Sequence, residues 1–168
     1  KKVLVGVDGV VLLAGLVGDP ITKKYPNESK IINDYGVKNV IDLCAEKDIE
    51  NFIFVSTCSN YGLIKDDELA HEEFVLNPLS LYAKSKVNAE KYILSLKGKT
   101  KMNPTVLRFA TAFGLSPRMR FDLTVSEFIR DMASGNDLLV YDADTWRPYC
   151  HVEDFARLIQ MIFEAPLE

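Results

Sequence analysis

The chain has 168 residues, of which 48% are hydrophobic and 26% charged, and this is the size and composition of a folded domain with its own core. Its net charge of −4 gives no reason to expect nucleic acid or an anionic membrane as a partner. The longest apolar run, at 10–17, is far shorter than the roughly 20 residues of a membrane-spanning helix.

Apolar runs separated by glycine and proline predict strands that alternate with helices. Two strands are expected near the start, at 3–5 and 10–14, followed by a loop at 15–27. The later elements are expected at 29–47 (helix), 52–56 (strand), 80–97 (helix), 105–109 (strand), 121–134 (helix), 138–141 (strand) and 153–164 (helix). This alternation predicts an α/β fold with a parallel sheet and helices on both faces, in which ligands bind at the carboxyl ends of the strands.

Cysteine and histidine show no pattern of a disulfide framework or a metal site. The two histidines lack metal-ligand spacing, so no metal is expected. The first residues, Lys1 to Gly6, contain no apolar segment of signal-peptide length. Three scattered cysteines indicate a reducing cytoplasm; they are Cys44, Cys58 and Cys150.

The richest stretch runs from the strand at 52–56 to Lys86. Thr57 follows that strand, and Tyr82 and Lys86 come later in the predicted helix at 80–97. Four residues apart, Tyr82 and Lys86 share a helix face, and Ala89 and Ile93 continue this face inward. A hydroxyl, a phenol and an ammonium together predict a proton-transfer site that serves a hydride-transfer cofactor.

Spacing alone leaves an alternative open. Tyr61 and Lys65 have the same spacing within a glycine-containing turn, so the pattern also arises without function. In the alternative, Tyr82 is a core residue and Lys86 extends its ammonium to solvent.

Six segments in a fixed order add to this pattern. They are 13–20, the Asn-x-x-Gly-x-x-Asn pattern at 33–39, Phe54 to Gly62, Pro78 to Lys86, Leu107 to Gly114, and Arg147 to Asp154. With them the chain resembles the extended short-chain dehydrogenase/reductase family, specifically its nucleotide-sugar epimerases, dehydratases and reductases. The resemblance implies a Rossmann-like domain at 1–114 and a partial substrate-binding lobe at 115–168 that is interleaved with the sheet.

The resemblance also implies roles for single residues. Tyr82 would be the acid/base, Lys86 would hold the nicotinamide ribose and lower the pKa of Tyr82, and Thr57 would hydrogen-bond the reacting oxygen. The residues expected at the cofactor, NAD or NADP, are Ala14, Gly15, Asn33, Tyr82, Lys86 and Phe109. Those expected at a nucleoside-diphosphate sugar are Thr57, Thr111, Arg120 and Arg147, the arginines because they pair well with phosphate. For Asn33 a helix-end polar contact is an equal alternative. For each arginine taken alone a solvated surface charge is the more common outcome, and the surrounding motif favours a substrate role for Arg147. A homodimer is expected.

The chain departs from the family pattern after Val5. Gly6-Val7-Asp8-Gly9 leads directly into the run at 10–14, which resembles the family's fourth strand. The glycine-rich turn that should bind the pyrophosphate, and the second and third strands with the acidic ribose-binding residue, do not occur there. We expect the parent polypeptide to carry such a turn between Val5 and Gly6, and the substrate lobe to be incomplete.

The residues after Thr57 indicate the reaction type. Family dehydratases carry Asp-Glu there, whereas this chain has Cys58-Ser59, which lack the second acid/base pair. We therefore expect an epimerase or reductase of a nucleoside-diphosphate sugar. The alternatives are a short-chain reductase of another carbonyl substrate and a non-catalytic cofactor-binding relative.

Overall fold

A computed structural model of the chain describes residues 2–65, 68–141 and 143–166. The chain divides into two compact units, the first ending at Arg108 and the second spanning Phe109–Ala165, with Pro166 counted in the first unit. The functional boundary expected after residue 114 stays a prediction. Among the described residues no helix is long and apolar enough to cross a membrane.

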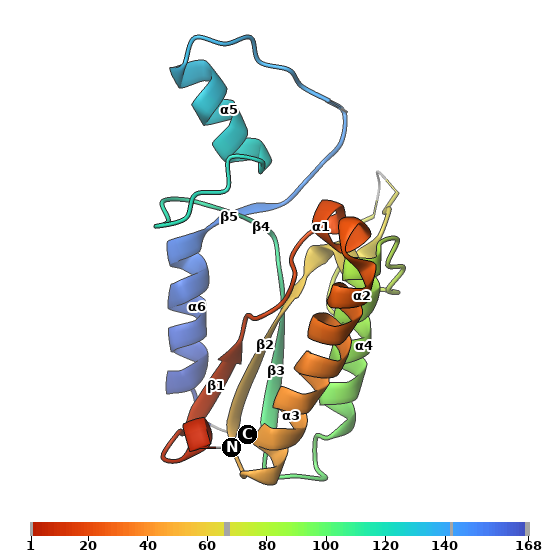
Figure 1. Ribbon diagram of the computed structural model, residues 1–168, viewed down its shortest axis with the longest axis vertical. Helices are drawn as coiled ribbons and strands as arrows, with labels where there is room; N and C mark the ends of the chain where they lie inside the picture. The colour runs from red at the N-terminus through yellow and green to blue at the C-terminus, as the bar shows by residue number, and fades with distance from the viewer. Residues whose placement is uncertain (1, 66–67, 142, 167–168) are drawn as a thin grey trace. The chain divides into compact units, whose positions relative to one another are not determined.

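The first unit contains a three-stranded sheet in the order β1-β2-β3 (Figure 1). The strands are β1 (Gly9–Leu12), β2 (Asn51–Thr57) and β3 (Asn103–Phe109). β1 and β2 are parallel, with Gly9 opposite Asn51 and Leu12 opposite Phe54. The central β2 is the most apolar strand, and Phe52, Ile53 and Phe54 are fully buried, as the continuous apolar run predicts.

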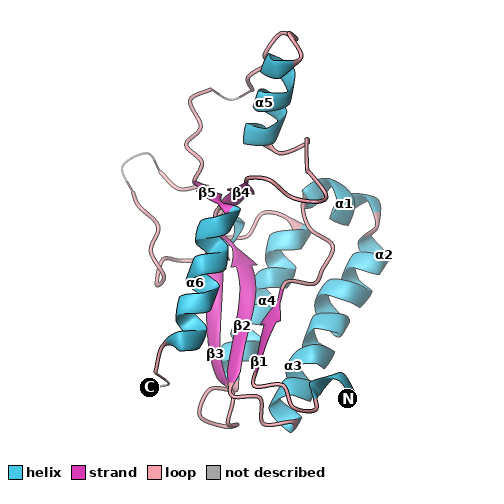
Figure 2. Ribbon diagram, turned by 90° about the vertical axis from the view of Figure 1, so that its left-hand side faces the viewer, coloured by secondary structure: helices cyan, strands magenta, loops and turns pink. Residues whose placement is uncertain are grey.

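Helices cover one face of this sheet (Figure 2). The chain forms α1 (Asp19–Lys24), α2 (Pro26–Ser29), the π-helical segment η2 (Lys30–Gly36), α3 (Val37–Glu46) and later α4 (Leu81–Ser95). α3 and α4 lie side by side, and Ile41, Cys44 and Ile93 from these helices pack with Phe52 and Phe54 in the core. The predicted helices at 29–47 and 80–97 are confirmed.

Two sequence-based expectations are wrong in this unit. The expected strand at 3–5 is the 3-10 helix η1 (Lys2–Leu4), and its valines are exposed, because a run of three residues without a neighbouring strand has no ladder to join. The expected loop at 15–27 contains α1 and the start of α2. Pro20 and Pro26 stand in the first turns of these helices, where proline is favoured, so they begin helices instead of breaking them.

The second unit contains a small sheet and two helices. β4 (Thr111–Phe113) pairs in parallel with β5 (Tyr149–His151), and the helices are α5 (Thr124–Ala133) and α6 (Val152–Glu164). The strand expected at 138–141 is wrong: Leu138 to Tyr141 is exposed and irregular. Its apolar sequence has no strand to pair with among the described residues. By contrast, β4 and β5, which the sequence patterns did not predict, pair with each other.

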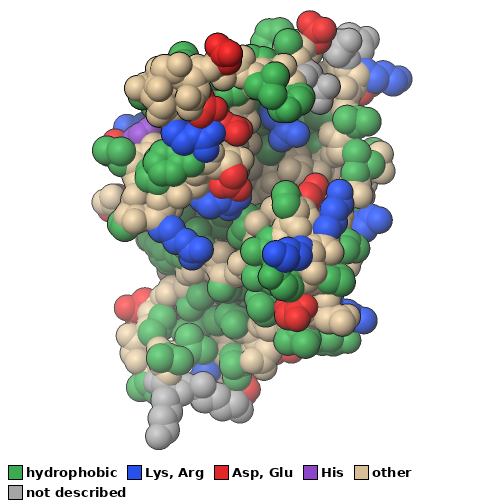
Figure 3. Space-filling view, turned by 45° about the horizontal axis from the view of Figure 1, so that its top comes forward, with side chains coloured by type: hydrophobic (Ala, Val, Ile, Leu, Met, Phe, Trp, Pro, Cys, Tyr) green, Lys and Arg blue, Asp and Glu red, His purple; other side chains and the backbone are tan. Residues whose placement is uncertain are grey.

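The molecular surface mixes side-chain types. On the face seen in Figure 3, lysine and arginine side chains lie among apolar and acidic ones.

Candidate active site

The carboxyl end of β2 turns sharply at Thr57. The Thr57 side chain is buried and caps the 3-10 helix η3 (Cys58–Tyr61), because its Oγ1 accepts a hydrogen bond from the Ser59 amide at 3.2 Å. Gly62 ends η3 with φ +73°, and a Cβ there would lie 2.2 Å from the Asn77 carbonyl oxygen. Only glycine fits this turn, which returns the chain toward α4.

α4 brings the tyrosine and the lysine to the same strand. Ser80 caps the helix through a 3.1 Å bond from the Ala83 amide to its Oγ, and Tyr82 lies in the first turn. Lys86 is 7% exposed, and its Nζ donates to the Val55 carbonyl of β2 at 2.7 Å. The same Nζ lies 5.8 Å from the Tyr82 ring centroid. The alternative in which Lys86 extends to solvent is therefore wrong.

Burial sets the protonation of this pair. Burial raises the pKa of Tyr82 to about 12, with Cys58 and Asp19 adding to the increase, and lowers the pKa of Lys86 to about 8. The expectation that Lys86 lowers the pKa of Tyr82 is thus wrong for this structure. The loss of hydration is the largest cause of the pKa shift of both groups. The Lys86 ammonium donates to the Val55 carbonyl and not to the phenol oxygen.

Asn33 joins the middle of η2 to the loop after β1. Its side-chain Oδ1 accepts from the Leu16 amide at 2.8 Å, and its Nδ2 donates to the Leu16 carbonyl at 2.9 Å. A Cβ on Gly15 would lie 3.0 Å from the same Oδ1, so the loop approaches Asn33 closely. Asn33 therefore supports the segment that carries exposed Ala14 and half-buried Gly15. That these residues line a cofactor stays a prediction.

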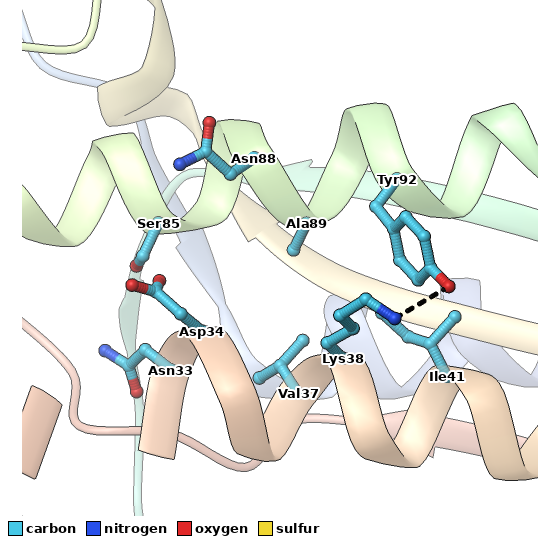
Figure 4. Close-up of a pocket in the computed structure, with 9 residues that line it drawn as sticks. All are labelled: Asn33, Asp34, Val37, Lys38, Ile41, Ser85, Asn88, Ala89 and Tyr92. Carbon is cyan, nitrogen blue, oxygen red and sulfur yellow. Dashed lines mark hydrogen bonds between the residues drawn. The ribbon is translucent and has the colours of Figure 1, made fainter. Parts of the chain in front are cut away.

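A pocket of about 290 Å³ lies between η2–α3 and α4 (Figure 4). Asn33, Asp34 and Ser85 lie at one end, and Lys38 donates to the Tyr92 hydroxyl at 3.1 Å at the other. Burial raises the pKa of Asp34. Thr57, Tyr82 and Lys86 do not line this pocket, so it is separate from the predicted catalytic residues.

The second unit holds the other residues expected at the substrate, apart from Thr57 in the first unit. Thr111 and Arg147 line a pocket of about 400 Å³, together with Thr124 and Tyr149 among others. Arg120 is not among its lining residues. Arg120 instead forms a two-pronged pair with the carboxylate of Asp122 at 2.6 and 2.7 Å, which neutralises its charge.

Phe109 contacts an aromatic partner instead of standing free. Its ring stacks on Phe155 of α6 with centroids 3.8 Å apart, so one face of Phe109 is already covered. Among the described residues no group of three or more histidine, cysteine and carboxylate side chains could hold a metal ion.

Comparison with known proteins gives this geometry a context. The whole chain, residues 1–168, matches the NAD dependent epimerase/dehydratase family. The chain belongs to this family. Its likeness to the extended short-chain dehydrogenases is thereby confirmed, and the family is NAD-dependent.

Two distant relatives match nearly all of the chain. The uncharacterized UDP-glucose epimerase YtcB of Bacillus subtilis (strain 168) is 27% identical over 172 residues, covering 98% of this chain and 52% of the relative. Protein CapI of Staphylococcus aureus is 26% identical, covering 94% of this chain and 47% of CapI. The chain spans about half the length of the curated relatives it matches.

Solved structures support the fold. The structure of MoeE5 in complex with UDP-glucuronic acid and NAD superposes with a TM-score of 0.88 at 26% identity, covering 99% of this chain and 56% of MoeE5. A UDP-N-acetylglucosamine 4-epimerase from Methanobrevibacter ruminantium M1 has a TM-score of 0.87 at 24% identity, covering 99% of this chain and 55% of its own. The Rossmann-like α/β class is confirmed.

The two halves of a dinucleotide differ in how well the residues of this epimerase-family chain suit them. Thr57 at the end of β2, with Tyr82 and Lys86 on α4, offers polar groups, but their role at a nicotinamide stays a prediction. Between η1 and β1, however, no glycine-rich turn leads into a helix; the glycines Gly15 and Gly18 lie in the later loop that joins β1 to α1. Gly6, with open space around it, only joins η1 to β1. The segment between η1 and β1 therefore does not provide the pyrophosphate half.

Four buried or partly buried polar residues beside the site were not singled out by the sequence patterns. Ser56, Asn60, Glu90 and Arg108, here called the Glu90 cluster, hydrogen-bond one another across β2, η3, α4 and β3. Glu90 lies one helical turn beyond Lys86 on the inward face of α4. A carboxylate at an inward position, where an ion needs a partner, was the available signal.

Proposed function

We propose that the whole protein is an epimerase or reductase of a nucleoside-diphosphate sugar. The observation that supports this most is the placement of Tyr82 and Lys86 by one face of α4 against β2, the strand that ends at Thr57. Membership of the NAD dependent epimerase/dehydratase family supports the same reading.

Each of the three residues has a distinct part in this proposal. Tyr82 exchanges a proton between its phenol oxygen and a sugar hydroxyl, Thr57 hydrogen-bonds the reacting oxygen, and Lys86 supplies positive charge beside the phenol. A phenol with a pKa of about 12 stays protonated at neutral pH, so its use as a base depends on stabilising the phenolate at the moment of reaction.

The substrate class is proposed from the second unit. Arg147 and Thr111 line a mainly polar pocket, and a guanidinium matches the geometry of phosphate oxygens. YtcB, described as a UDP-glucose epimerase, and MoeE5, solved with UDP-glucuronic acid, point to a uridine-diphosphate sugar. Arg120, already paired with Asp122, would have to leave that carboxylate before it could bind a ligand.

Cys58 and Ser59 favour epimerisation or reduction over dehydration. Elimination of water needs a second acid and base beside the first, and a half-buried thiol and an exposed serine are poorly suited to those tasks. The test is to incubate the full-length protein with several UDP-sugars and identify products by NMR. A stable 4-keto-6-deoxy sugar formed from an unmodified hexose would contradict this assignment.

Tyr82→Phe in the full-length protein tests the catalytic assignment. We expect turnover to fall about 10²- to 10⁴-fold, the usual contribution of a general acid/base, while the fold is retained. Tyr35→Phe, at an exposed tyrosine on η2, is the matched control and should keep full activity. Near-normal turnover by Tyr82→Phe would refute the role of Tyr82.

A non-catalytic, cofactor-binding relative is the second candidate, because the glycine-rich turn is absent between η1 and β1. A short-chain reductase of another carbonyl substrate remains the alternative among enzymes. If the full-length protein binds NAD but converts no UDP-sugar, reduction of simple carbonyl compounds by NADH separates the two.

A further inference from the structure

Glu90 is the most completely bonded carboxylate in the described chain, and it is 1% exposed. Its Oε1 accepts hydrogen bonds from the Ser56 hydroxyl and from Asn60 Nδ2, the latter at 2.6 Å. Arg108 donates to both carboxylate oxygens, with Nη2 to Oε2 at 2.8 Å, Nε to Oε2 at 3.1 Å and Nε to Oε1 at 3.3 Å. Little of the pair is accessible to water, since the Arg108 side chain is 17% exposed and that of Glu90 is 2% exposed.

The Glu90 cluster ties together the segments that carry the predicted catalytic residues. Ser56 immediately precedes Thr57 at the end of β2, Asn60 belongs to η3, and Glu90 lies two helical turns beyond Tyr82 on the same face of α4. Asn60 Nδ2 also donates to Ser56 Oγ at 3.0 Å, so strand end, turn and helix meet at one carboxylate.

Arg108 extends the same connection to the loop after η3. Its Nη1 donates to the Tyr61 hydroxyl at 3.2 Å and to the Glu72 carbonyl at 2.7 Å, and its guanidinium lies 5.2 Å from the Tyr61 ring centroid. Glu90 therefore holds an arginine that in turn bonds Tyr61, the last residue of η3, and the loop that follows it.

We propose that Glu90 is a positioning residue, which sets Thr57 relative to Tyr82 by holding Ser56, Asn60 and Arg108 on α4. This inference rests on the proposed function, because it concerns the geometry of the same acid/base site. Displacement of a reacting group by about 1 Å commonly costs on the order of 10²-fold in rate, so such a support acts on kcat.

The alternative is that the Glu90–Arg108 pair only stabilises the fold. A buried ion pair is often dispensable for stability when both partners are replaced by apolar side chains, whereas removing one partner is costly. This difference allows the two roles to be separated. The double replacement should be more stable than the single Glu90 variant, but it still offers no hydrogen-bond acceptor to Ser56 and Asn60.

Three variants of the full-length protein form the test. Glu90→Gln keeps the shape but places an amide donor against the Arg108 fork. Glu90→Leu combined with Arg108→Met removes the pair as a unit and guards against misfolding of the single variant. Tyr92→Phe is the matched control: it removes hydrogen bonds to Asp42 and Lys38 from the same helix, on the side that faces α3.

Each variant is measured by amide hydrogen exchange of residues 57–62 and by steady-state kinetics with a UDP-sugar. We expect Glu90→Gln and the double variant to exchange at least about tenfold faster in this segment, since losing a charged hydrogen bond shifts a local equilibrium by roughly 10- to 100-fold. We also expect kcat to fall about 10- to 100-fold with KM nearly unchanged. Tyr92→Phe should alter neither quantity.

Two results would overturn the proposal. The first is that Glu90→Gln changes the amide exchange rate and kcat no more than Tyr92→Phe does, when each variant is measured at the same number of degrees below its own melting temperature. The other is recovery of both quantities in the double variant once stability is recovered. If instead no variant or wild type turns over any UDP-sugar, the proposed function fails, while the exchange measurement by itself still decides whether Glu90 holds Thr57 in place.

Discussion

Lys86 carries an ionisable group in a place where burial opposes its charge. One carbonyl, that of Val55, accepts a hydrogen bond from the Lys86 ammonium at 2.7 Å, and the ring of Phe54 lies 4.5 Å from the same Nζ. These contacts compensate only part of the lost hydration, so the pKa of Lys86 falls to about 8. The charge near Tyr82 is therefore sensitive to mildly alkaline pH.

This depressed pKa predicts a particular dependence of stability on pH. An unfolded lysine titrates near 10.4, so between about pH 8 and 10.4 the unfolded chain binds a proton that the folded chain lacks. The free energy of unfolding of wild type, relative to Lys86→Met, should therefore rise through this window, by roughly 3 kcal/mol in total. Urea unfolding at several pH values between 7 and 10 measures the difference.

The design separates Lys86 from other titrating groups. Tyr82 is present in both proteins, and its raised pKa lowers folded-state stability only above about pH 10, outside the measured range. Lys84→Met, at an exposed lysine on the same helix, serves as the control. A difference between wild type and Lys86→Met that stays constant from pH 7 to 10 would contradict the depressed pKa.

At the scale of elements, α4 is the part that positions the site. Its start is defined by Ser80, whose side chain satisfies the Ala83 amide, and its inward face is formed by Ala83, Val87 and Ile93. Because Tyr82 lies in the first turn, fraying of this end would displace the phenol before anything else.

Removal of the cap should weaken α4 at the site. We expect Ser80→Ala to lower the free energy of unfolding by about 1 kcal/mol, the usual cost of losing a serine cap, and to speed amide exchange in the first turn. Thermal unfolding followed by circular dichroism measures the first effect. Ser80→Thr retains the hydroxyl and should retain most of the stability; equal losses for both variants would argue against the capping role.

At the scale of the molecule, the chain has the fold of the epimerase family around the predicted catalytic residues, but no glycine-rich turn between η1 and β1. The sheet consists of β1, β2 and β3, and η1 stands where the family pattern predicts a strand. Amides at a helix start after a glycine-rich turn normally supply much of the dinucleotide affinity, and no such turn lies between η1 and β1, where the family pattern predicts it.

The 168-residue chain by itself should therefore bind NAD weakly. We expect a dissociation constant above about 1 mM, which corresponds to less than roughly 4 kcal/mol of binding free energy. Isothermal titration calorimetry with NAD measures this, and the full-length protein, if it carries the glycine-rich turn, is the positive control. Micromolar binding by the 168-residue chain would show that another set of residues holds the pyrophosphate.

Local sequence determined the elements whose signals are complete within one segment. The apolar run of β2 predicts a buried strand because it needs no polar alternation, and the four-residue spacing of Tyr82 and Lys86 predicts a shared face because a helix has 3.6 residues per turn. The cap at Ser80 and the hydroxyl residues at the end of β2 follow in the same way. The family resemblance, carried by ordered motifs, was readable for the same reason.

Only the tertiary structure decided which groups meet across long separations. Val55 and Lys86 are 31 residues apart, and Ser56 and Glu90 are 34 apart, so no local periodicity pairs them. The same reason explains the wrong strands at 3–5 and 138–141: a strand is stable only when a second strand satisfies its backbone, and a single run does not reveal that partner. The pKa values of Tyr82 and Lys86 likewise depend on burial, which the whole packed unit creates.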